Sequence, residues 1–342
     1  MMRKMRREGL FKKVISAVSA ASLMAIMLTG CGGSSGGTNT SDATGGTDNK
    51  VYKIGITQIS DHPSLDNCRE GFIQGLKNEG FVEGENLEIE YIGAQDDMAK
   101  NTLIAQNFAN SKKDLVCGIA TPSAQALYAA CLDKKIPVIF NAVSDPVAAN
   151  LAKSSTEALP GISGVSDQLP VEAQLKLIRK VLPDAKKIGI LYSTGEANSV
   201  STLKTYQELA PTYGFEIVEK GISKKADIPA AADVILNEVD CITNMTDNTV
   251  VSSLAIILDK ANAKNIPIFG SEEEQVANGC VACAGLDYVQ LGIQAGEMAG
   301  KVLKGADIST LPYETLTESS VAVNDEAAAK LGISIPDDIK NN

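Results

Sequence analysis

From Val51 onward, short apolar runs alternate with amphipathic stretches, and this order restricts the fold more than any other feature of the sequence. Alternating strands and helices predict parallel sheets that are covered by helices on both faces. The apolar runs are continuous, as is typical of strands buried on both sides. We expect strands at residues 53–59, 87–91, 115–120, 138–142, 161–165, 187–192, 215–219, 241–244, 267–270 and 281–286. Between the strands, we expect helices at residues 65–79, 99–111, 171–182, 200–213 and 250–264.

Ten such strands in about 290 residues are too many for one small sheet. They predict an α/β fold of two doubly wound parallel-sheet lobes joined by a hinge. Lys53-Ile-Gly-Ile and Lys187-Ile-Gly-Ile open two runs of similar layout, which indicates a duplicated lobe. We place the first crossing between lobes near residues 161–167, a return near 285–288, and a third crossing near Val321. Lobe 1 then comprises residues 51–164 plus about 288–318, and lobe 2 comprises 165–287 plus about 319–342.

The net charge of −11 is unevenly spread, because residues 1–30 carry six Lys and Arg against one Glu. This leaves −16 for the remainder, an acid excess that argues against nucleic acid as a partner. The basic start and the apolar run at 14–27 predict a secretory signal at residues 1–30. The run ends in Leu28-Thr-Gly-Cys31, which resembles the bacterial lipobox. Lipidation of Cys31 would anchor the exported protein on the outer face of a membrane, through a flexible tether at residues 31–50.

The cysteines and the single His limit the chemistry that the chain can perform. One His excludes a multi-His metal centre. Six Cys remain beyond Cys31, an even number that leaves disulfides open in an exported protein. Four of them lie in apolar runs, where free Cys acts as a small hydrophobe. Cys280-x-x-Cys283 would point to opposite sides of a strand. We therefore expect neither a metal nor another cofactor.

Polar residues collect where the predicted strands end, and ligands of open parallel sheets bind beyond those ends. Ser, Thr, Asn and Asp also cap helices, so each residue alone has a structural alternative. The carboxylates are more numerous than capping requires. The candidate ligand-binding residues are Gln58, His62, Thr121, Ser123, Asp145, Glu196, Asn198, Ser199, Asp247, Asn248, Glu272 and Asp287.

These residue types suit a zwitterion such as an amino acid. Helix starts at Ser123 and Ser199 offer free amide groups for a carboxylate. Asp247, with Asp145 or Glu272, offers a negative charge for an ammonium group. Phe140, Tyr192, Phe269 and Tyr288 could provide an aromatic surface or belong to the core. His62 could either line the cleft or lie in a solvated loop.

Six segments together resemble one family. They are YKIGITQISDHPSLD at 52–66, GIATPSAQ at 118–125, VSDP at 143–146, YSTGEANS at 192–199, TDNT at 246–249 and FGSE at 269–272. The sequence resembles the ABC-transporter substrate-binding lipoproteins of the TrpX-like, tryptophan/tyrosine-binding branch, over nearly all of residues 51–338. The resemblance implies a type I periplasmic-binding-protein fold. It places Thr121, Ser123 and Asp145 on one wall of the cleft, and Asn198, Ser199, Asp247 and Glu272 on the other.

The resemblance also implies a function and its partners. A monomer would close about its hinge on a small zwitterionic ligand, in which an aromatic amino acid is favoured, and would deliver it to an ABC permease. Three alternatives stay open: an enzyme that uses paired carboxylates, a sensor that presents its ligand to a receptor, and a binding protein for a nucleoside or another small metabolite. The sequence has no nucleophile elbow, phosphate loop or dinucleotide motif, which favours binding over catalysis.

Overall fold

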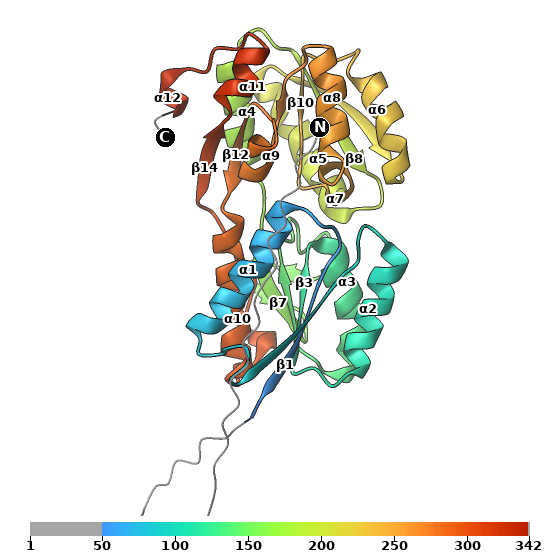
Figure 1. Ribbon diagram of the computed structural model, residues 1–342, viewed down its shortest axis with the longest axis vertical. Helices are drawn as coiled ribbons and strands as arrows, with labels where there is room; N and C mark the ends of the chain where they lie inside the picture. Colours follow the sequence, from blue (N-terminus) through green and yellow to red (C-terminus); the bar gives the residue numbers. More distant parts are fainter. Residues whose placement is uncertain (1–49, 341–342) are drawn as a thin grey trace, which may run out of the picture. The chain divides into compact units, whose positions relative to one another are not determined.

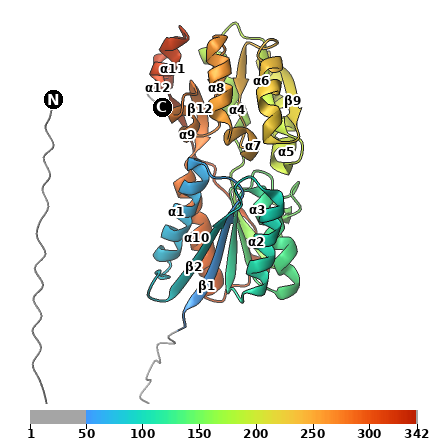
Figure 2. The ribbon, with the colours of Figure 1, turned by 45° about the vertical axis from the view of Figure 1, so that its right-hand side comes forward.

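The computed structural model describes residues 50–340, and its first sheet contains six parallel strands (Figure 1). Their order across the sheet is β13-β7-β4-β3-β1-β2. The strands are β1 (Tyr52–Gln58), β2 (Leu87–Gly93), β3 (Leu115–Ile119), β4 (Val138–Asn141), β7 (Ile162–Ser166) and β13 (Glu314–Thr315). Helices α1 (Pro63–Asn78) and α10 (Tyr288–Leu303) lie on one side of this sheet, and α2 (Met98–Asn110) and α3 (Thr121–Cys131) lie on the other (Figure 2).

The second sheet has the strand order β11-β10-β8-β9 and is also parallel. Its strands are β8 (Lys187–Ser193), β9 (Glu216–Ile222), β10 (Cys241–Thr243) and β11 (Ile268–Phe269). Strand β12 (Ala282–Leu286) runs beside β11, and β14 (Ser319–Val323) pairs with β12 in the antiparallel direction. Around these strands lie helices α4 (Val171–Val181), α5 (Ala197–Leu209), α6 (Ile228–Ile235), α7 (Asn248–Val251), α8 (Leu254–Ala263), α9 (Glu273–Ala277), α11 (Asp325–Lys330) and α12 (Asp337–Lys340).

The chain passes between the two sheets three times: between β7 and α4, between β12 and α10, and between β13 and β14. A small hairpin of β5 (Ala152–Ser154) and β6 (Glu157–Ala158) lies between β4 and β7 in the chain. Buried apolar side chains form one cluster around the first sheet and two around the second.

Helices α1 and α10 pack with their backbones in contact, because glycines occupy the interface on both. A Cβ atom on Gly292 would lie 2.3 Å from the carbonyl oxygen of Cys68, and one on Gly71 would lie 2.2 Å from that of Val289. Gly75 and Gly296 repeat the arrangement one turn further along. No side chain fits in these places, since real Cβ contacts stay beyond about 3 Å. The helix pair is therefore held at a fixed separation.

All ten predicted strands are present within three residues of their predicted ends, as are most of the predicted helices. The single helix predicted at 250–264 was wrong, since the structure breaks it into α7 and α8. The break falls at Ser252 and Ser253, whose hydroxyls donate hydrogen bonds to the carbonyl of Thr249 at 3.0 and 3.2 Å. Such side-chain bonds compete with the regular helical pattern. The antiparallel strand β14 was not predicted either.

Candidate ligand-binding site

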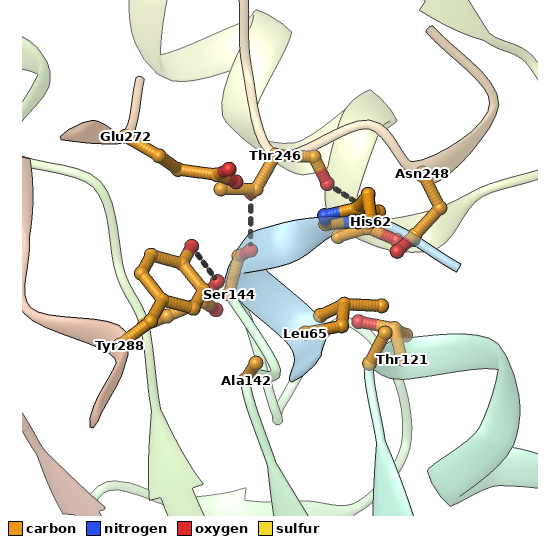
Figure 3. A pocket seen from close by; sticks show the side chains of 12 residues that line it. His62, Leu65, Thr121, Ala142, Ser144, Thr246, Asn248, Glu272 and Tyr288 are labelled. Atoms are coloured by element: carbon orange, nitrogen blue, oxygen red, sulfur yellow. Dashed lines mark hydrogen bonds between the residues drawn. The ribbon is translucent and has the colours of Figure 1, made fainter. Parts of the chain in front are cut away.

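An enclosed cavity lies where the carboxyl ends of the two sheets meet (Figure 3). The volume that the centre of a water-sized sphere can occupy in this cavity is about 10 Å³, which is room for about one water molecule. An amino acid would therefore need the walls to move apart before it could enter. The cavity is lined by His62, Leu65, Ala120, Thr121, Ala142, Ser144, Asp167, Asn198, Thr246, Asn248, Glu272 and Tyr288. Residues from both sheets contribute, so a ligand here would contact both lobes at once.

Asp167 and Tyr288 form one side of the cavity. The Tyr288 hydroxyl donates a hydrogen bond of 2.8 Å to one carboxylate oxygen of Asp167. The Ser144 hydroxyl also interacts with this carboxyl group, but the Oδ1 atom is buried and accepts no hydrogen bond of regular geometry. Burial raises the pKa of Asp167, against the opposing effect of its hydrogen bonds. A buried carboxylate oxygen without a donor is costly, and a ligand cation would remove that cost.

Glu272 is a second buried carboxyl in the cavity wall. Its side chain is 1% exposed and accepts a hydrogen bond from the Ser64 hydroxyl, on the first turn of α1. Burial raises the pKa of Glu272 to about 8, and the neighbouring Glu274 acts in the same direction. Glu272 is therefore mostly protonated at neutral pH, where it offers an O–H donor as well as an acceptor.

Among the remaining polar groups, one hydrogen bond joins the two lobes and two buried atoms are unpaired. The hydroxyls of Ser144 and Thr246 are hydrogen-bonded at 2.9 Å, and they follow β4 and β10 in the two sheets. Asn198 donates to the carbonyl of Thr246 at 2.8 Å, while its own Oδ1 is buried without a partner. His62 Nδ1 is also buried without a partner. Three buried polar atoms without a partner thus surround this cavity.

Two alanines in the cavity wall have backbone conformations that L-residues rarely adopt. Ala120 has φ 70° and ψ 157°, and Ala142 has φ 56°. They directly follow β3 and β4, which are neighbours in the first sheet. Such strain costs on the order of 1–3 kcal/mol per residue and concentrates at ligand sites. Both strained residues lie at the end of the first lobe that lines the cavity.

The structure brings five of the predicted residues onto the cavity and places seven outside it. On the cavity are His62, Thr121, Asn198, Asn248 and Glu272. Outside its lining are Gln58, Ser123, Asp145, Glu196, Ser199, Asp247 and Asp287. Several of these seven side chains form hydrogen bonds with the loops and helices to which the lining residues belong.

Glu196 and Asp247 satisfy the start of α7 rather than facing the cavity. Glu196 accepts hydrogen bonds from the backbone amides of Asn248 and Thr249, at 3.0 and 3.1 Å, and from both side chains. Asp247 accepts from the amides of Ser193 and Val250. Burial and the nearby Glu196 raise the pKa of Asp247. These two carboxylates therefore fix the loop that presents Thr246 and Asn248.

The other predicted residues also have protein partners. The Ser123 hydroxyl donates to Asn101, and Gln58 donates to Asp66. Asp145 accepts bonds from Ser201 and from the Ala148 amide, and Ser199 hydrogen-bonds Asp247. The exposed Asp287 caps α10 through the amides of Val289 and Gln290. Asp247 and Asp287 therefore cap helices, which is the structural alternative that the sequence analysis gave for such residues.

Seven of the lining residues are not among the twelve candidates: Leu65, Ala120, Ala142, Ser144, Asp167, Thr246 and Tyr288. Ser144 and Thr246 follow predicted strand ends, so the rule that ligands bind beyond those ends does select them. Asp167 follows β7 directly, at a position treated only as a crossing between lobes. Tyr288 was considered only as an aromatic surface. Its hydroxyl partner, Asp167, lies 121 positions earlier in the chain and gives no local signal.

The six Cys among the described residues are all buried and free. Cys280 and Cys283 do not lie on opposite sides as predicted, since both belong to one apolar cluster. Strand β12 begins only at Ala282, so the alternation of a strand does not apply to Cys280. Within residues 50–340, no group of three or more His, Cys, Asp or Glu is arranged to hold a metal ion. In the same part of the chain, no helix combines the length and apolar character needed to span a bilayer.

The two parallel-sheet lobes, the three crossings and the cavity between them define a type I periplasmic-binding-protein fold, a class that binds small solutes between its lobes. This confirms the predicted fold class. Residues 53–342 match the model of the family described as ABC transporter substrate binding protein. The chain belongs to this family, whose members serve ABC transporters as extracytoplasmic solute-binding proteins rather than as enzymes.

Similar proteins agree with this assignment. The chain is 41% identical over 321 residues to the tyrosine-binding protein of Clostridioides difficile, covering 94% of this chain and 92% of that protein. A crystal structure of an ABC domain from Streptococcus pneumonia in complex with L-Trp is 32% identical, with a TM-score of 0.83, covering 85% of this chain and 98% of that one. A ligand-free, open substrate-binding protein with adhesive properties from Clostridium difficile is 40% identical, with a TM-score of 0.65, covering 84% and 97%.

Proposed function

We propose that this chain binds an aromatic amino acid in the cavity between its lobes and delivers it to the permease of an ABC importer. The observation that carries the proposal is the unpaired Oδ1 of Asp167, a buried acceptor on a cavity wall. No Lys or Arg belongs to the described residues that line this cavity, so the protein itself provides no cation there. An amino acid would bring its ammonium group to this oxygen. The names of the similar proteins, which refer to tyrosine and L-Trp, support an aromatic ligand.

The carboxylate of the ligand would bind at the start of α3. Thr121 is the first residue of this helix and lines the cavity. The amide groups at a helix start are free of partners within the helix and favour an anion. Asn198, Asn248 and Glu272 would complete the polar contacts of the ligand. Leu65, Ala120, Ala142 and the ring of Tyr288 supply apolar surface for an aromatic side chain.

Binding would be coupled to closure about the hinge. The chain superposes better on the L-Trp complex, with a TM-score of 0.83 at 32% identity, than on the ligand-free, open protein, with 0.65 at 40% identity. The direct contacts between lobes, such as Ser144 with Thr246, further support a closed arrangement. A ligand that touches both lobes favours this arrangement by its differential contacts.

The export and anchoring of the protein belong to the same proposal. The signal at residues 1–30, Cys31 and most of the tether at 31–50 lie outside the described residues. Their sequence supports lipidation of Cys31, with the binding domain tethered to the outer face of the membrane as a monomer. We take the lobes to be residues 51–164 plus about 288–318, and 165–287 plus about 319–342, with β7 extending the first lobe by two residues to Ser166.

The test is isothermal titration calorimetry of the purified protein with tyrosine, tryptophan and two truncated analogues. Tyramine lacks the carboxylate, and 3-(4-hydroxyphenyl)propionate lacks the ammonium group. We expect tyrosine or tryptophan to bind and both analogues to bind far more weakly, because each leaves one end of the site unpaired. If no amino acid bound, or if the propionate bound as tightly as tyrosine, the proposal would be wrong.

A further inference from the structure

We infer that His62 is a specificity-determining residue, whose Nδ1 atom accepts a hydrogen bond from the side chain of the ligand. The site would then select amino acids whose ring carries an O–H or N–H group over those with a plain hydrocarbon ring. This inference rests on the proposed function, because it assumes that an amino acid occupies the cavity. It extends the proposed function by naming the protein group that distinguishes one aromatic side chain from another.

His62 occupies the N-cap position of α1, but its side chain makes no capping bond. Its backbone carbonyl accepts the helical hydrogen bond from the Asp66 amide at 3.1 Å. The side chain is 8% exposed and lines the cavity instead. His is not among the residues that N-cap positions favour. The local structure therefore gives no reason for an imidazole at this position, whereas the cavity does.

The contacts of Asn248 determine which ring nitrogen of His62 carries the proton. The Asn248 side-chain nitrogen donates to Glu196 at 2.6 Å, which leaves its oxygen to face His62. His62 and Asn248 are hydrogen-bonded through their side chains, and Nδ1 is the ring nitrogen without a partner. The bond is thus donated by Nε2–H. In a neutral imidazole the other nitrogen, Nδ1, is then an acceptor.

The imidazole is neutral at physiological pH. Burial lowers the pKa of His62 to about 4, outweighing the opposing effects of Asp66, Asp96 and the bond to Asn248. Nδ1 therefore keeps its lone pair and needs a donor. Among the described residues none provides one.

A zwitterion without a side-chain donor cannot satisfy this atom. All of its N–H donors belong to the ammonium group, which the proposed function places at Asp167. Figure 3 shows His62 across the cavity from Tyr288, the residue that is hydrogen-bonded to Asp167. A phenol O–H or an indole N–H at the far end of the ligand would reach a position that the ammonium group does not. Phenylalanine would bury Nδ1 unpaired.

Titration calorimetry with tyrosine, tryptophan, phenylalanine and 4-fluorophenylalanine tests this inference on the unmodified protein. The fluorine is close to a hydroxyl in size but donates no hydrogen bond. We expect tyrosine or tryptophan to bind roughly 10- to 100-fold more tightly than both ligands that lack a donor, because leaving a buried acceptor unpaired is costly. Equal affinity for tyrosine, tryptophan and phenylalanine would overturn the inference while leaving the proposed function intact. If no amino acid bound, the proposed function would fail, and the inference with it.

Variants assign the preference to His62. In His62→Leu we expect affinity for tyrosine to fall to the level of phenylalanine, while affinity for phenylalanine changes less than threefold. His62→Asn retains an oxygen near the position of Nδ1 and should keep part of the preference. Gln74→Leu, an exposed change on the same helix, serves as the control. If His62→Leu melted normally but weakened tyrosine and phenylalanine equally, His62 would be a structural residue and the inference would be wrong.

Discussion

Replacing Asp167 by Asn preserves the shape of the side chain but removes its charge, so it tests the ammonium site directly. Asn can still accept the Tyr288 hydroxyl, which Asp167 binds at 2.8 Å. Its NH₂ group would replace the unpaired Oδ1 and would turn a donor toward the ligand's ammonium group. Removing one partner of a buried, hydrogen-bonded charge pair costs about 2–5 kcal/mol. At about 1.4 kcal/mol for each factor of ten, the dissociation constant should rise roughly 30- to 4,000-fold.

Two measurements separate this loss from a loss of folding. Titration calorimetry gives the dissociation constant of the ligand, and a thermal melt without ligand gives the stability. Burial raises the pKa of Asp167, so a neutral amide should not lower the melting temperature of the ligand-free protein. Asp307→Asn is the matched control, because Asp307 is an exposed cap outside the cavity. A well-folded Asp167→Asn variant that bound within about threefold of the parent, less than 1 kcal/mol, would refute the role of Asp167.

Three further predictions concern the fold, the pH dependence and the anchor. Gly292→Ala places a Cβ 2.3 Å from the Cys68 carbonyl, and overpacking of about 1–3 kcal/mol should lower the melting temperature by roughly 2–10 °C. Gly195→Ala is the control, because its Cβ meets open space and should leave the melting temperature unchanged. Equal melting temperatures of the two variants would contradict this reasoning. The pKa of Glu272 is raised from 4.5 to about 8, so the stability that it contributes is fully present below about pH 4.5 and is lost as pH rises toward 8. Glu272→Gln should therefore gain melting temperature relative to the parent between about pH 5 and 8, and a constant difference over that range would argue against the buried, protonated state. Cys31→Ser should move the protein from the membrane fraction to the soluble fraction on cell fractionation, while an unchanged distribution would exclude Cys31 as the anchor.

The sequence was informative where the signal is local and less so where it depends on contacts between distant segments. The central strands were predictable because each is a short apolar run buried on both faces, whereas the edge strands β2 and β9 are largely half-buried or exposed. Thr121 and Asn248 were found on the cavity because each lies just beyond a strand of a parallel sheet. The same rule selected Asp247, although its carboxylate accepts the backbone amides of Ser193, at the end of β8, and of Val250, in α7. Nothing in a single sequence separates a carboxylate that caps a helix from one that faces a cavity.

Asp167 shows the opposite case. It resembles a linker residue in sequence, because it lies in a stretch rich in Gly and Ser between the two predicted lobes. Its importance arises only when α10 returns to the first lobe and brings the Tyr288 hydroxyl to it. The second crossing was predicted near residues 285–288, but no local pattern indicates that it brings together two side chains 121 positions apart.

The close packing of α1 and α10 limits how this protein can adapt to other ligands. Both helices begin at the cavity: α1 carries Leu65 in its first turn, and α10 begins with Tyr288. With glycine backbones already touching, substitutions along this interface cannot move the two side chains closer together, and larger residues there would destabilise the helix pair. The helix pair therefore fixes the distance between Leu65 and Tyr288, and with it the size of ligand that fits between them. Changes in the size of ligand that related proteins accept should therefore accumulate in the opposing loops around Thr246 and Glu272, and selection experiments for larger or smaller ligands should randomise those loops first.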